Sequence, residues 1–193
     1  MNNSDIMKIL TAVTANKDLL IPLISSWDIE DVKRGKIVIT EDLLNDSYRD
    51  IILSKGAPYV KSYAFRIVGG GIFLDLAVRH DKIGDINLKY TMMIEELIFE
   101  KAAHRVRLRY TEQAQGDGGT MQSMMLKAAK AAGTLLKTLI GFSKGQAGLK
   151  VDNAYIDIDL DEMLSANGNA SSIPENLVLS LDSCDAGRLV LKL

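Results

Sequence analysis

The stretch Ile86-Asn87-Leu88-Lys89-Tyr90-Thr91-Met92-Met93-Ile94 decides the fold class. Apolar residues occupy every second position, and mostly polar residues stand between them. Successive side chains of a strand point to opposite faces of its sheet, so this alternation is typical of a strand with one buried and one wet face. It predicts an antiparallel sheet.

The sequence on both sides continues the same pattern. Upstream, a long strand over Tyr59–Val68 meets three glycines and returns as Ile72–His80. Downstream, a further pair follows at Leu97–Phe99 and Arg105–Thr111. Strands joined by short polar or glycine-rich turns form hairpins. We therefore expect a meander of consecutive antiparallel hairpins.

The second deciding feature is an apolar run from Met121 to Phe142, which Thr120 can cap. Its apolar residues recur at helical spacing, and Lys127, Lys130 and Lys137 lie opposite them. Because further apolar residues widen this face around most of the helix, we expect a buried helix enfolded by the sheet. Two alternatives stay open: the methionine-rich helix lines an adaptable apolar cavity, or its lysine face rests on anionic lipid.

These patterns predict an α+β fold in which a long, strongly curved antiparallel sheet wraps around one long helix. We expect a single domain over residues 1–193. Its parts are an N-terminal helical segment, a first strand-rich unit, the long apolar helix and a second strand-rich unit, at residues 1–30, 36–112, 120–143 and 151–193.

The order of elements recurs along the chain. In the first half a strand leads into Thr40-Glu41-Asp42-Leu43-Leu44, then a proline, a long strand, a glycine turn and a return strand. In the second half a strand leads into Leu160-Asp161-Glu162-Met163-Leu164, and Pro174 and a closing hairpin follow. The spacings differ and few residues are identical, so chance and internal duplication both remain as explanations.

Composition excludes several classes of protein. The hydrophobic share is 47% and the charged share 25%, which is typical of a globular chain. A net charge of −2 disfavours nucleic acid as a partner. One cysteine and two histidines leave little material for a metal site, so we expect no metal and no cofactor. With no recognisable signal sequence or membrane span, the expected location is the cytoplasm.

Two stripes of opposite charge alternate with apolar residues. On strands, each stripe would place its charges on one face, about 6–7 Å apart. The acidic stripe lacks the residue spacing of a calcium-binding loop. If the two strands pair, cross-strand ion pairs explain both stripes, although the arginines could instead bind a phosphate or a lipid head group. The stripes consist of Asp157, Asp159 and Asp161, and of Arg105, Arg107 and Arg109.

Acid and base residues gather near His104, namely Glu95, Glu96 and Glu100. The sequence identifies neither a nucleophile nor a group that would orient the histidine, so we predict no catalytic site there. The three glycines Gly69–Gly71 precede no helix and lack the residues of a phosphate loop, so they indicate a hairpin turn.

The lone cysteine, Cys184, lies beside Asp182 and Asp185. Negative neighbours raise the pKa of a thiol, which argues against a reactive thiolate. We therefore assign no nucleophile to this position.

In its layout the chain resembles the tubular lipid-binding superfamily, to which the bactericidal/permeability-increasing protein belongs. The resemblance covers roughly residues 36–193 and rests on strands such as those in Tyr63–Leu76 and Tyr155–Leu164. It implies an elongated α+β fold with an apolar groove and no enzyme activity.

The predicted function is non-enzymatic binding of a lipid-like or other hydrophobic ligand in an apolar groove, with peripheral contact to a membrane as a further expectation. The alternative is a protein–protein interaction or assembly module with a fully packed core and no ligand. Ligand, partner and oligomeric state stay open. The predicted ligand-binding residues are Met121, Met124, Met125, Ala128, Leu135, Leu136 and Leu139.

Overall fold

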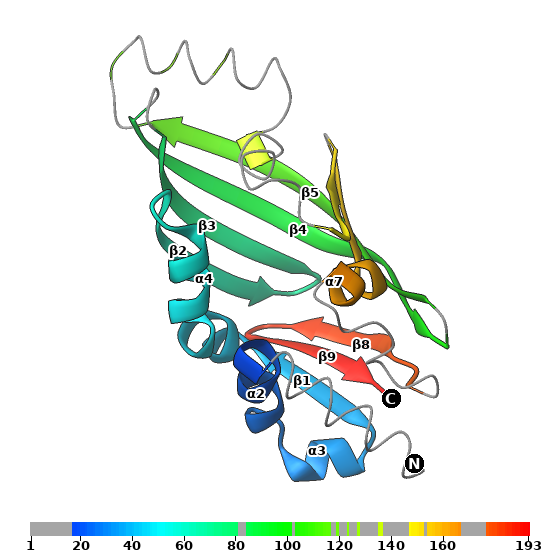
Figure 1. Cartoon of the computed structure of the whole chain (residues 1–193). Helices are drawn as coiled ribbons and strands as arrows, with labels where there is room; N and C mark the ends of the chain where they lie inside the picture. The colour runs from blue at the N-terminus through cyan, green and yellow to red at the C-terminus, as the bar shows by residue number, and fades with distance from the viewer. Residues whose placement is uncertain are drawn as a thin grey trace.

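The computed structural model describes residues 17–80, 84–101, 103–116, 119, 123, 127, 135–136, 147–152, 154–166 and 177–193. The larger elements are strands, and several short helices connect or flank them (Figure 1). The helices are α2 (Lys17–Ser25), α3 (Ile29–Lys33), the π-helix η1 (Leu43–Ser47), α4 (Arg49–Gly56) and α7 (Leu160–Ala166). The strands are β1 (Lys36–Thr40), β2 (Val60–Val68), β3 (Gly71–His80), β4 (Gly84–Glu100), β5 (Ala103–Gly116), β6 (Leu149–Val151), β7 (Tyr155–Asp159), β8 (Ser180–Asp185) and β9 (Arg188–Lys192).

The larger sheet has six strands in the order β2-β3-β4-β5-β7-β6, and every neighbouring pair is antiparallel. Strands β2 to β5 are consecutive hairpins, which confirms the predicted meander. The alternation in β4 is confirmed as well: Leu88 and Tyr90 are each 1% exposed, whereas Lys89 and Met93 lie on the exposed face. The apolar face of this sheet forms the core, together with Leu135.

The smaller sheet has three strands in the order β1-β9-β8, also antiparallel. The hairpin β8–β9 confirms the predicted closing hairpin. Figure 1 shows this sheet below the larger one, with α2 and α3 beside it and α7 at the junction of the two sheets. Backbone hydrogen bonds join the sheets, because Gly187 at the β8–β9 turn donates to Ile67 in β2 over 2.7 Å.

The prediction that the sheet wraps around one long helix is wrong. The described chain is mostly antiparallel strand, and its helices are short. One contact shows why the apolar run misled us. The backbone N–H groups of Leu135 and Leu136 donate to the Glu112 carboxylate on β5, over 2.9 and 2.8 Å. These contacts place Leu135 and Leu136 against the larger sheet, where Leu135 joins its core. Helical periodicity cannot reveal such contacts, because it reports only local spacing.

The order strand–helix–hairpin is present in both halves of the chain. In each half, the strand that leads into the helix pairs with a strand of the other half: β1 pairs with β9, and β7 pairs with β5. The two halves therefore exchange these strands. Whether an internal duplication produced this order stays a hypothesis.

None of the described helices is both long enough and apolar enough to cross a lipid bilayer.

Candidate functional site

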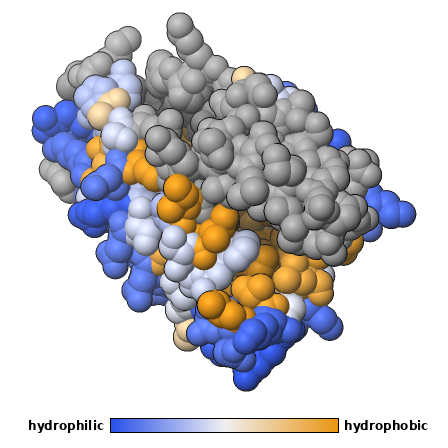
Figure 2. Space-filling model, turned by 60° about the horizontal axis from the view of Figure 1, so that its bottom comes forward, coloured by the Kyte–Doolittle hydropathy of each residue, from blue (hydrophilic) through white to orange (hydrophobic). Residues whose placement is uncertain are grey.

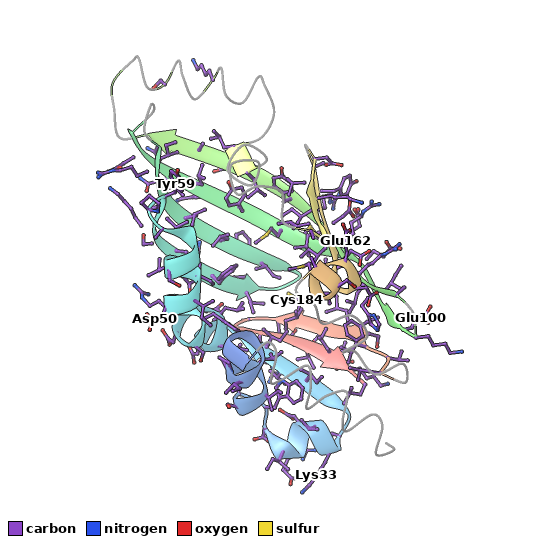
Figure 3. The ribbon with its side chains drawn as sticks, viewed as in Figure 1. Lys33, Asp50, Tyr59, Glu100, Glu162 and Cys184 are labelled. Atoms are coloured by element: carbon purple, nitrogen blue, oxygen red, sulfur yellow. The ribbon has the colours of Figure 1, made fainter. Side chains whose placement is uncertain are left out.

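A cleft lies where the smaller sheet meets the β2–β3 turn. Its volume is about 290 Å³, and it is partly open to solvent. Ile72 and Ile94 from the larger sheet face Leu181 from β8 across it, and Cys184 and the backbone of Gly71 complete the wall. Figure 3 shows Cys184 at this junction of the two sheets.

The cleft results from a difference in strand length. Strand β4 pairs with β3 only up to Met92 and then continues to Glu100 with β5 alone. The chain turns from β2 into β3 at Gly70, whose φ of +84° favours glycine. Beyond this turn, β8 rather than β3 lies near β4. The two strands belong to different sheets and do not form a regular pair.

Two backbone hydrogen bonds connect the smaller sheet to the rims of the cleft. Gly70 N donates to Cys184 O at one end, and Leu179 N donates to Phe99 O at the other, each over 2.9 Å. The segment of β8 between these bonds, Leu181–Ser183, borders the cleft. The cleft lies near the Gly70–Cys184 bond, and Ile94 is the residue of β4 that lines it.

The polar groups of the wall are few. Asp182 forms an ion pair with Lys36 over 3.0 Å, and both side chains are exposed to solvent. The hydroxyl of Ser183 donates to the Asp185 carboxylate over 2.8 Å. The remaining wall is apolar or backbone.

The Cys184 thiol belongs to this wall, with its Sγ 3.8 Å from the carbonyl oxygen of Gly71. Burial raises its pKa most, the backbone N–H of Gly70 opposes this, and the charge of Asp185 raises the pKa further. This direction agrees with the sequence argument against a reactive thiolate, although burial rather than the neighbouring acid is the main cause. The thiol stays protonated at neutral pH.

His104 has the orienting partner that sequence reasoning missed. Its Nδ1 lies 2.7 Å from Asp161 Oδ1, and its backbone N–H donates to Asp161 Oδ2 over 3.1 Å. Asp161 comes from α7, 57 positions along the chain. The statement that nothing orients this histidine is therefore wrong. The signal was the acidic start of α7, which we assigned only to a charged stripe.

The histidine ring is buried, with the residue 3% exposed, and the ring edge of Phe99 packs against it at 4.6 Å between centroids. Its Nε2 has no hydrogen-bond partner in the described part of the chain. Glu96 and Glu100 are exposed, and Figure 3 shows Glu100 at the far tip of the β4–β5 hairpin. These acids therefore lie on the exposed surface, whereas the His104 ring is buried.

The charged stripes pair as predicted. Strand β5 lies antiparallel to β7, so Arg105 is opposite Asp159 and Arg107 is opposite Asp157. Arg105 Nε lies 3.0 Å from Asp159 Oδ2, and Arg107 Nε lies 2.6 Å from Asp157 Oδ1. These carboxylates neutralise the two arginines, which leaves less charge for a phosphate or lipid head group. Asp161 lies apart from this arrangement, because it binds His104.

The predicted ligand-binding residues lie away from the cleft. Leu135 is 4% exposed and belongs to the core, and Leu136 packs against that core. Lys127 from the predicted lysine face is exposed. The remaining predicted residues lie outside the described ones, namely Met121, Met124, Met125, Ala128 and Leu139.

Sequence reasoning did not find the cleft. Gly69–Gly71 was correctly interpreted as a hairpin turn, but not as the wall of a site. The available signal was a difference in length between two strands. The apolar alternation of β4 continues beyond Met92, the residue that pairs near the start of β3. Within the described residues no group of acids, histidines and cysteine is arranged to hold a metal ion.

Comparison of the chain with protein-family models, curated proteins and solved structures found no match. These comparisons neither support nor oppose the resemblance to the tubular lipid-binding superfamily.

Proposed function

We propose that this chain is a non-enzymatic binding protein and that the cleft between β4 and β8 holds an apolar group of its ligand. The observation that supports this proposal is the set of three aliphatic side chains, Ile72, Ile94 and Leu181, which line a cavity of about 290 Å³. Water in such a cavity contacts apolar walls, so replacing it with an apolar group is favourable.

The size of the cleft limits the ligand. Pockets for small molecules usually measure about 300–1,000 Å³, so this cleft is at the lower end of that range. It suits the end of an acyl chain or one or two apolar side chains rather than a whole lipid. This differs from the groove along a helix that we expected from the sequence.

The chemistry of the wall supports binding rather than catalysis. Burial raises the pKa of the Cys184 thiol, so the thiol is a weak nucleophile at neutral pH. The Asp182 carboxylate is held by Lys36. Among the described residues, neither group has a base or an orienting partner of the kind that activates a nucleophile.

The surface near β8 also favours a ligand with an apolar part. Leu181 is 39% exposed and Val178 is 50% exposed, although both are large aliphatic residues. In Figure 2 the molecule is turned so that the bottom of Figure 1 comes forward. Hydrophobic residues lie on this face, with polar residues between them. Exposed apolar residues that adjoin a cavity are typical of a binding site.

The lone cysteine provides a direct test, because its thiol is part of the cleft wall. Iodoacetamide should alkylate Cys184 more slowly when decanoic acid, or a short peptide with apolar side chains, fills the cleft. At a probe concentration ten times Kd the rate should fall about tenfold. Intact-protein mass spectrometry measures the rate at each probe concentration.

Two matched variants complete the test. Leu181→Arg places a charge on the cleft wall and should abolish the protection. Val178→Arg makes the same change at an exposed residue outside the wall and should preserve it. Circular dichroism confirms that both variants fold. If no apolar probe protects Cys184 in the wild-type protein, the proposal is wrong.

A further inference from the structure

Two adjacent methionines of β4 differ sharply in their access to solvent. Met93 is 44% exposed on the wet face of the larger sheet, whereas Met92 is 7% exposed and belongs to the core. Successive side chains of a strand point to opposite faces, which explains the contrast. An oxidant dissolved in water therefore reaches the sulfur of Met93 directly, but not that of Met92.

Met93 is exposed because the strand on one side of it ends at this point. The pairing of β3 with β4 stops at Met92, which lies opposite Ile72, and the chain turns at Gly70. On the other side β5 continues, and Arg109 lies directly opposite Met93. The thioether thus has a paired neighbour on the β5 side and open access on the β3 side.

Arg109 contacts the sulfur of Met93. Its Nη2 donates to Sδ over 3.7 Å, and its Nε lies 4.0 Å from Oε1 of Glu95. That ion pair is longer than the two neighbouring pairs of the arginine stripe, which measure 3.0 and 2.6 Å. Because a thioether is a weak acceptor, the guanidinium would bind a stronger acceptor at the same place more tightly.

Oxidation by a peroxide creates such an acceptor. A lone pair of the sulfur attacks one oxygen of hydrogen peroxide, so the S–O bond forms as the O–O bond breaks. The leaving hydroxide takes the proton of the transferred oxygen and becomes water. The sulfur loses two electrons to the peroxide and becomes a polar, chiral sulfoxide. Its oxygen can accept a charge-assisted hydrogen bond from a guanidinium.

We propose that Met93 is a site of reversible oxidation by a peroxide, and that Arg109 selects one of the two sulfoxide epimers. The two lone pairs of Sδ lead to opposite epimers. The guanidinium lies on one side of the sulfur, so the two lone pairs are not equivalent towards the oxidant or in binding the new oxygen. This inference does not depend on the cleft, because Met93 and the cleft residue Ile94 point to opposite faces of β4.

The position of Met93 makes the modification compatible with the fold. Oxidation of a core methionine places a polar group among apolar side chains, which is costly. The sulfoxide of Met93 would instead face water and Arg109. Methionine sulfoxide is returned to methionine by reductases that are each specific for one epimer, so an accessible sulfoxide of one epimer suits repeated oxidation and reduction.

Peptide mapping after brief treatment with hydrogen peroxide tests the choice of site. Fragment ions distinguish oxygen on Met93 from oxygen on Met92. In the folded protein Met93 should react at least about tenfold faster, because Met92 becomes accessible when the core opens locally. In concentrated urea the two rates should become similar. Equal rates in the folded protein would overturn the inference.

Two reductases of opposite epimer specificity test the role of Arg109. After the folded protein is oxidised and digested, the fraction of the Met93 peptide that each enzyme reduces gives the ratio of epimers. We expect a ratio of about two to five in the wild-type protein, the range of an exposed charge interaction, and a ratio near one in Arg109→Ala.

Arg107→Ala is the matched control, because it removes a neighbouring arginine of the same stripe whose partner is Asp157. It should keep the wild-type ratio of epimers, and circular dichroism confirms that both variants fold. Equal amounts of the two epimers in the wild-type protein would overturn the inference. An excess that survives Arg109→Ala would overturn it as well, because the strand itself would then select the epimer.

Discussion

Two junctions between a strand and a helix, one in each half of the chain, use the same local device. At the first, Thr40 ends β1 and its hydroxyl accepts a hydrogen bond from Leu43 N over 3.2 Å. At the second, Asp159 ends β7 and its carboxylate accepts one from Glu162 N over 3.0 Å. The last residue of the strand thus caps the helix that follows.

At both junctions, an acidic residue follows the cap by one or two positions. Its carboxylate accepts a hydrogen bond from a backbone N–H of the meander. Glu41 accepts from Ile67 on β2 over 2.5 Å, and Asp161 accepts from His104 on β5 over 3.1 Å. Each acid therefore connects its helix to a strand distant in the sequence.

The two acids nevertheless serve different purposes. Glu41 acts with Asn45, whose side-chain amide binds both the N–H and the C=O of Phe65. Together they satisfy backbone groups of Phe65 and Ile67 on the outer edge of β2 and so oppose pairing of this stretch with another strand. Asp161 instead holds a buried imidazole whose Nε2 has no partner in the described residues. The comparison teaches that the same junction can serve two ends: Glu41 satisfies the backbone of an outer strand, whereas Asp161 orients a buried side chain.

The largest effect is expected for Asp161→Ala. The change removes the acceptor of two hydrogen bonds and takes from the buried His104 ring the partner of its Nδ1. We expect a loss of about 2–4 kcal/mol in the free energy of unfolding, because each buried polar group left unsatisfied costs about 1–3 kcal/mol. Urea denaturation measures the loss.

Glu162→Ala is the control for this variant, because it removes an exposed acid from the same helix. It should change the free energy of unfolding by less than about 0.5 kcal/mol. Similar losses in both variants would show that the contact with His104 is not the cause.

A smaller loss is expected for Glu41→Ala. The change removes the acceptor of the buried Ile67 N–H, and we expect a loss of about 1–3 kcal/mol. Glu41→Gln keeps an acceptor oxygen and should restore much of the stability. The neighbouring exposed acid provides the control, and Asp42→Ala should have little effect. If Glu41→Ala also promotes self-association in light scattering, the sealing of β2 prevents pairing between edges.

The difference between these regions also shows what could be predicted from the sequence. The alternation from Ile86 to Ile94 reflects local strand geometry, so the meander was predicted correctly. The charged stripes reflect which strands pair, so the β5–β7 ion pairs were predicted correctly too. The sheet wrapped around one long helix was predicted wrongly, because helical periodicity reports local spacing and not how distant segments pack. For the same reason the Asp161–His104 pair and the cleft were missed: each depends on which distant segments become neighbours.

A still smaller effect is expected for the ion pairs on the wet face of the larger sheet. Arg107 pairs with Asp157, and the two side chains are 47% and 39% exposed. Arg107→Ala should lower the free energy of unfolding by about 0.2–1 kcal/mol at low salt, and by less in 1 M sodium chloride. A loss that does not depend on salt would indicate packing against the Tyr155 ring, 5.4 Å from the guanidinium, rather than charge.

The two caps differ in charge, which predicts a small difference in pH dependence. The N–H of Glu162 and then the side chain of Arg105 lower the pKa of Asp159, although its partial burial opposes them. A carboxylate whose pKa is lower in the folded state stabilises the fold above its unfolded pKa, near 4, and loses this contribution as the pH falls through the folded value. Asp159→Ala should therefore cost more stability at pH 7 than at pH 3. Thr40 carries no charge, so Thr40→Ala should cost the same at both pH values. Urea titrations of both variants at the two pH values measure this difference, and a pH-independent loss for Asp159→Ala would show that its cap depends on geometry alone.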